Sequence, residues 1–121
     1  GDGRKIAYLG GAAGGLVTTA ADYAQFIGMI CRRTRLSPES HAQMFSPHTP
    51  ITSGDMAGAG DWALGWIVMR TGPRTMILHD GNNQEFRSFA GFDPATGDGL
   101  VAFTNGRNGG DLIHAILDEV Q

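Results

Sequence analysis

One short stretch of the chain combines residue types from which a chemical site can be made: His79, Asp80, Gly81 and Asn82. Histidine changes its charge near neutral pH, so it can orient or polarise a bound group. Glycine has no side chain to block the approach of a ligand to the backbone. The stretch follows a short alternating run, so the sequence predicts a polar site displayed at the end of a strand.

The alternating run from Thr75 to His79 is the first element that must position this site. Met76 and Leu78 would lie on one face of the strand, and Ile77 and His79 on the other. Polar residues from position 80 to 83 are expected to end the strand. Because neighbours along a strand point to opposite faces, Asp80 should not pair directly with His79.

Three more segments have the composition of strands. Phe86–Phe92 and Leu100–Thr104 flank a connection rich in glycine and aspartate, which is typical of a hairpin with a long loop. Upstream, the segment from Trp62 to Arg70 is rich in aromatic and β-branched residues. We therefore expect about four antiparallel strands in sequence order, forming a meander.

Helices are predicted for much of the remainder. Thr18 or Thr19 can cap a helix whose apolar residues recur at spacings of three and four. Ser37 precedes a proline at the first position of a second helix, and an amphipathic helix follows Asp111. The predicted helices run from Thr19 to Arg33, from Ser37 to before Pro47, and from Asp111 onward. Together these elements predict an α+β fold in which the C-terminal helix covers one face of the sheet and the first helix lies nearby.

Length and composition restrict the other possibilities. The 121 residues are expected to form a single domain, 1–121, with a Gly-rich lead-in over 1–17 and a loop over 47–60. A net charge of -3, with scattered basic residues, argues against nucleic acid as a partner. No apolar run is long enough for a membrane span. Secreted, periplasmic and cytoplasmic locations all stay open.

Metal and disulfide chemistry are not expected. Cys31 is the single cysteine, so the chain cannot form an internal disulfide or a cysteine-based metal site. Its sequence context indicates a small apolar residue on the inner side of a helix. The four histidines share no ligand spacing, and we expect neither a metal nor a cofactor. The chain has no initiator methionine and soon runs into GGAAGG, which suggests part of a longer protein.

The order of the segments resembles a known family. The segments GGAAGGLVTTAADYAQF, LSPESHAQMFSP, WALGWIV and LHDGNNQEFRSFAGFDPATGDGLVAFTNG are followed by a closing helix. This order is similar to the C-terminal part of serine β-lactamase-like hydrolases, which include class C β-lactamases, DD-peptidases and related esterases. The resemblance covers nearly the whole chain from Gly10 onward. It implies a C-terminal fragment of the β-lactamase/transpeptidase-like fold.

In that family the site combines an S-x-x-K motif, a Y-x-N motif or a relative, and a K-T-G or H-x-G motif. Only the last is present, as His79–Gly81. The single lysine, Lys5, has Asp2 three residues before it, and neither Tyr8 nor Tyr23 begins a Y-x-N motif. The chain on its own is therefore expected to be inactive.

The resemblance also implies roles for individual residues. His79 would orient and polarise the substrate, Gly81 would leave its approach free, and the N–H of Asn82 would donate to the oxyanion. The expected substrate-binding residues are Asp80, Asn83 and Arg87. Of these, Asn83 and Arg87 are expected to face the same region.

Structural roles are the alternatives for the two charged residues. Asp80 could be a solvated turn acid, or could pair with Arg87 or Arg74 across the hairpin. Arg87 could equally pack its stem over the sheet.

The resemblance implies a parent enzyme that forms an acyl-enzyme with a small ester, amide or peptide and needs no cofactor. Histidine in place of the lysine of penicillin-recognising members points to an esterase or peptidase. A non-catalytic relative that binds a peptide or cell-wall fragment, an interaction scaffold, and a fragment with no independent role are the alternatives. An uncovered sheet edge or face predicts a homo-oligomer.

Overall fold

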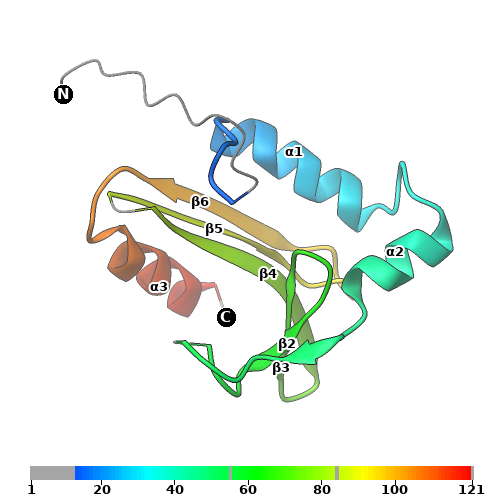
Figure 1. Cartoon of the computed structure of the whole chain (residues 1–121). Helices are drawn as coiled ribbons and strands as arrows, with labels where there is room; N and C mark the ends of the chain where they lie inside the picture. Colours follow the sequence, from blue (N-terminus) through cyan, green and yellow to red (C-terminus); the bar gives the residue numbers. More distant parts are fainter. Residues whose placement is uncertain (1–12, 55, 84, 121) are drawn as a thin grey trace.

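A computed structural model describes residues 13–54, 56–83 and 85–120 of the chain. The architecture is α+β, with an antiparallel sheet between helices on its two faces (Figure 1). In chain order the elements are α1 (Ala20–Cys31), α2 (Pro38–Phe45), β1 (Thr49–Pro50), β2 (Gly60–Trp62), β3 (Ile67–Thr71), β4 (Arg74–Asn83), β5 (Phe86–Phe92), β6 (Gly99–Thr104) and α3 (Gly109–Glu119).

The sheet has six strands in the order β1 to β6, each antiparallel to the next, so the meander is confirmed but the expected count of about four is wrong. The segment expected as a single strand over 62–70 is divided between β2 and β3. A tight turn separates them, in which the N–H of Ala63 donates to the carbonyl of Trp66 at 2.7 Å and Gly65 has φ +79. The expected loop over 47–60 contains β1 and the first residue of β2.

β4 is longer than the alternating run predicted. The four polar residues from 80 to 83 do not end the strand, because β5 continues to pair with them as far as Asn83, which lies opposite Phe86. On the other side, β3 pairs with β4 only as far as Leu78. The second half of β4 is therefore paired on one side, and no other strand of the described chain pairs with its free side.

Two apolar layers cover the sheet. The layer that contains α1 and α2 is called the α1 face, and the layer that contains α3 is called the α3 face. Ile77 and Leu78, neighbours on β4, enter opposite layers, which confirms the predicted alternation. The buried residues of the α1 face are Ile27, Ile30, Trp66, Ile77, Ala90 and Phe92, and those of the α3 face are Ile51, Ile67, Leu78, Phe89 and Ile113.

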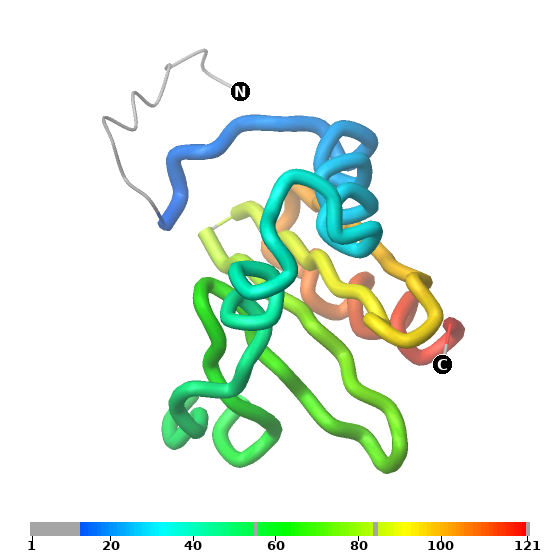
Figure 2. The backbone as a smooth tube through the Cα atoms, turned by 90° about the vertical axis from the view of Figure 1, so that its right-hand side faces the viewer, coloured from blue at the N-terminus to red at the C-terminus, as the bar shows by residue number. Residues whose placement is uncertain are grey.

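α1 and α2 begin at the residues that the sequence indicated, whereas α3 begins at Gly109, two residues before the predicted start at Asp111. The hydroxyl of Thr19 accepts from the N–H of Asp22, and that of Ser37 accepts from the N–H of Ser40, both at 3.1 Å. α1 and α3 lie against β5 and β6, whereas the hairpin of β3 and β4 extends away from α1 (Figure 2). No helix in the described ranges combines the length and the apolarity that a membrane crossing requires.

Candidate functional site

The HDG tripeptide lies on the exposed edge of the sheet rather than in a turn. β3 begins only at Ile67, because the turn from Ala63 to Trp66 reverses the chain beside His79. The residues from His79 to Asn83 consequently keep a side with no strand pairing in the described part of the chain. This open edge is the structural setting of the candidate site.

The backbone direction along the open edge follows from two contacts of β5. In an antiparallel strand, alternate residues turn their N–H and C=O groups to opposite neighbours. The carbonyl of Arg87 accepts from the hydroxyl of Thr104 on β6 at 3.4 Å, so the backbone groups of Ser88 point toward β4. Ser88 lies opposite Gly81, which therefore turns its own groups toward β5. The N–H of Asn82, one residue on, points to the open edge.

The same direction follows independently from the other side of β4. The carbonyl of Val68 lies against Gly60 of β2, so Val68 turns its backbone groups toward β2. Its neighbour Ile67 therefore turns toward β4 and pairs with Leu78. Two and four residues beyond Leu78, Asp80 and Asn82 turn their groups to the same side, where β3 has ended.

The imidazole of His79 is held at this edge by a backbone bond and an aromatic ring. Its Nδ1 lies 2.6 Å from the carbonyl oxygen of Asp80. A carbonyl oxygen only accepts, so Nδ1 carries the proton, and Nε2 of the neutral ring is an acceptor. The indole of Trp62 lies with its centroid 6.0 Å from the imidazole, at an interplanar angle of 50°. His79 itself is exposed.

Gly81 has a packing reason that the sequence did not reveal. The side chain of Ser88, directly across the ladder, occupies the space that a Cβ at Gly81 would fill. The predicted reason, free approach of a substrate, remains a proposal. The absence of a side chain at Gly81 lets β4 and β5 pair with Ser88 turned toward it.

Asp80 lies apart from His79, as strand alternation predicts. Its register partner Phe89 belongs to the α3 face, whereas the partner of His79 is Ala90 of the α1 face. Asp80 is an exposed strand residue and not a turn acid. In the described ranges no ion pair joins Asp80 to either arginine suggested for it.

Asn83 and Arg87 do not face the same region, contrary to expectation. Arg87 lies opposite Asn82, and Asn83 lies opposite Phe86, one position further along, so strand alternation turns the two side chains to opposite faces. The guanidinium of Arg87 donates to the carbonyl of Phe86 at 3.1 Å. The amide of Asn83 lies on the side that Gly14 approaches, where a Cβ would be 3.5 Å from Nδ2.

Sequence reasoning missed two side chains that lie against the tripeptide, Trp62 beside His79 and Ser88 beside Gly81. A two-residue connection between Asn83 and Phe86 would have placed Ser88 opposite Gly81 by counting. The position of Trp62 had no local signal, because it depends on the turn that separates β2 from β3. The sequence pattern also gave no sign that Gly14, in the Gly-rich lead-in, lies near the side chain of Asn83.

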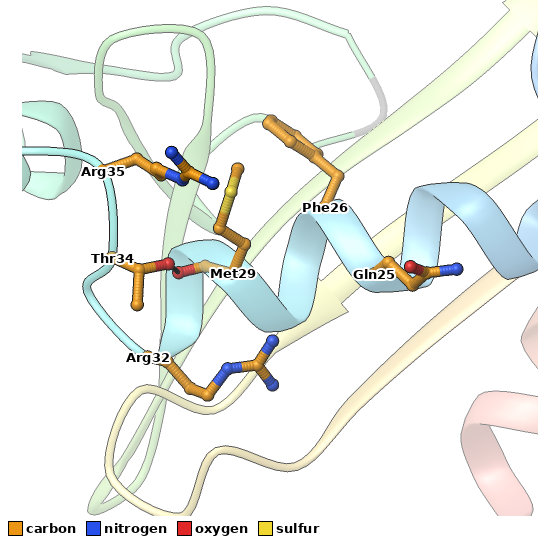
Figure 3. A pocket seen from close by; sticks show the side chains of 6 residues that line it. All are labelled: Gln25, Phe26, Met29, Arg32, Thr34 and Arg35. Carbon is orange, nitrogen blue, oxygen red and sulfur yellow. Dashed lines mark hydrogen bonds between the residues drawn. The ribbon is translucent and has the colours of Figure 1, made fainter.

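A surface depression at the end of α1 has side chains on different sides of the helix, with Phe26 and Met29 on one side and Arg32 on another (Figure 3). In the ranges that the structure describes, no three histidine, cysteine, aspartate or glutamate side chains gather where they could hold a metal ion. Cys31 is half-buried against the α1 face, as its position predicted.

Comparison with known proteins yields one match. A family model described as Beta-lactamase matches residues 1–119, which is nearly the whole chain. Neither the curated proteins nor the solved structures contain a match to the chain.

Proposed function

The chain belongs to the beta-lactamase family, and from this membership we propose that it is the C-terminal part of a serine hydrolase acting through an acyl-enzyme. In this proposal the chain supplies the HDG strand and one oxyanion donor. The observation that carries it is the outward direction of the Asn82 amide on an edge that no described strand covers. An upstream serine would be acylated by an ester, amide or peptide, and water would then release the acyl group.

Each residue of the open edge has a role in the proposed chemistry. The N–H of Asn82 donates to the oxygen on which negative charge develops, and removal of one such donor costs about 3–4 kcal/mol of transition-state stabilisation. His79 orients and polarises the substrate beside it. Gly81 is proposed to keep a side chain away from the approach to the neighbouring Asn82 amide. Asp80, Asn83 and Arg87 are proposed as substrate contacts, with Asn83 on the face of His79 and Asp80 and Arg87 on the opposite face of the strand pair.

The experiment uses nitrophenyl esters, with and without a longer protein that carries the upstream motifs. The chain has no S-x-x-K or Y-x-N motif, so on its own it is expected to hydrolyse no ester. The longer protein should be labelled by a serine-reactive phosphonate, and His79→Ala should reduce its turnover. Turnover by the 121-residue chain that disappears in His79→Ala would contradict this division of the site.

A non-catalytic relative is the second candidate, because membership of a family and its fold do not by themselves fix a function. Such a protein would use the open edge to bind a peptide or a cell-wall fragment. The upstream sequence separates the two candidates, because a hydrolase requires an intact S-x-x-K and a tyrosine motif. A longer protein that lacks both motifs and still binds peptides would support the second.

Association of the chain with itself is a further part of the proposal. β6 is the last strand of the sheet, and the side chains of Phe86, Phe103 and Leu64 are partly exposed. An unpaired edge and exposed apolar groups favour strand pairing between copies. Size-exclusion chromatography with light scattering should give a dimer or a larger assembly, and a monodisperse monomer would count against association.

A further inference from the structure

We propose that Trp62 is a positioning residue that holds His79 as its Nδ1–H tautomer, so that the site presents an unprotonated Nε2 to a hydrogen-bond donor. Among the described residues, three histidine rings contact a backbone carbonyl. His79 does so through Nδ1, at 2.6 Å from the oxygen of Asp80. His41 and His48 do so through Nε2, at 3.0 and 3.2 Å.

These contacts assign a proton to one nitrogen of each ring. A carbonyl oxygen cannot donate, so the ring nitrogen that faces it must carry the hydrogen. His79 is therefore the Nδ1–H tautomer, whereas His41 and His48 are Nε2–H tautomers. Within the described chain, Nε2 of His79 has no hydrogen-bond partner, and the residue is exposed. Its lone pair is open to a ligand.

Trp62 constrains the orientation of the His79 ring more firmly than the single hydrogen bond to the Asp80 carbonyl can. An exposed hydrogen bond between adjacent residues competes with water, so by itself it fixes a ring weakly. The backbone of Trp62 is held between two strands, opposite Thr49 and Ile67, and its carbonyl accepts from the N–H of His48 at 2.8 Å. The paired backbone thus fixes the origin of the indole side chain. The indole centroid lies 6.0 Å from that of the imidazole, and the indole restricts rotation of the imidazole ring.

The consequence for substrate class rests on the proposed function. A lysine at this position could only donate, and would attract a substrate carboxylate. An unprotonated Nε2 instead accepts a hydrogen bond, and offers a carboxylate no donor. The substrates that fit are esters or amides with a hydroxyl, amide N–H or ammonium group at this point, rather than a carboxylate.

The test is nitrogen-detected NMR of the histidine side chains in the 121-residue chain, at about pH 8.5, where an ordinary imidazole is neutral. In the wild type, His79 should show the Nδ1–H pattern, while His41 and His48 show the Nε2–H pattern. The exposed His114 serves as the reference for an unconstrained ring. Trp62→Ala should shift His79 toward the pattern of His114, and Trp62→Phe should restore the wild-type pattern.

The unchanged patterns of His41 and His48 report that each variant is folded. An Nε2–H pattern for His79 in the wild type would overturn the proposal, whatever the variants do. A wild-type pattern in Trp62→Ala would show that Trp62 does not hold the His79 tautomer. Because no substrate is present, these results are independent of whether the chain is part of a hydrolase.

Discussion

Gly81 and Ser88 face each other across the β4–β5 ladder, and the hydroxyl of Ser88 takes the place that a side chain at Gly81 would need. This contact lies in the middle of the candidate site. It means that the glycine of the HDG tripeptide has a structural reason that does not depend on any substrate. Stability and activity measurements on this pair therefore separate two roles of the same residue.

The double substitution at this pair tests the contact. Gly81→Ala should lower the free energy of unfolding by an amount near the low end of the range of about 1–3 kcal/mol for overpacking, because the terminal hydroxyl of Ser88 must rotate away. In a Ser88→Ala background the nearest atom would be the Cβ at residue 88, at 3.7 Å, so the overlap disappears. There Gly81→Ala should be neutral or stabilising by about 0.4–1 kcal/mol, because alanine restricts the unfolded chain. Equal costs in both backgrounds, measured by urea denaturation, would refute the contact.

A pair of adjacent glycines, Gly109 and Gly110, offers a matched comparison at the start of α3. A Cβ at Gly109 would overlap the side chain of Thr104 on β6, whereas one at Gly110 would meet nothing within 4 Å. Gly109→Ala should destabilise the chain by about 1–3 kcal/mol. Gly110→Ala should stabilise it by up to about 1 kcal/mol through helix propensity. Thermal unfolding of both variants tests how α3 packs against β6. A Gly109→Ala variant that is more stable than Gly110→Ala would contradict this packing.

Features that depend on local sequence were predictable. The caps at Thr19 and Ser37 lie at the starts of α1 and α2, and the amphipathic pattern after Asp111 falls in α3. These features were predictable because a cap and a helical stripe involve residues within a few positions of each other. The alternation of Ile77 and Leu78 between the two faces was predictable for the same reason.

Features that depend on a distant neighbour were not predictable. The polar residues after His79 look like a strand end, but β5 pairs with them through Asn83. The turn that divides β2 from β3 requires a positive φ at Gly65. The sequence did not indicate this turn, because aromatic and β-branched residues lie on both sides of it. The contact of Trp62 with His79 follows from that division. The catalytic roles of the candidate residues come from the family and remain proposals.

Alkaline pH tests the environment of Cys31. Burial raises the pKa of its thiol above the ordinary value of 9.0, while its backbone hydrogen bond and Arg32 lower it to a smaller extent. The folded state thus favours the neutral thiol, so this stabilisation is complete below the ordinary pKa and is lost as pH rises through the raised one. The burial of Tyr23 raises its pKa and acts in the same direction.

Urea denaturation of the wild type and Cys31→Ala at pH 7 and about pH 10 provides the measurement. The wild type should lose more stability between the two pH values than Cys31→Ala, which keeps the contribution of Tyr23 but lacks that of the thiol. The same loss in both proteins would show that the thiol is not protected by burial.

The most direct test of the open edge is amide hydrogen exchange of β4, followed by NMR in a sample diluted until it is monomeric. After correction for intrinsic rates, the amides of Asp80 and Asn82 should exchange faster than those of His79 and Gly81, which point toward β5. This alternation would place the proposed oxyanion donor on the uncovered side. Protection of Asn82 as strong as that of Gly81 would contradict the account.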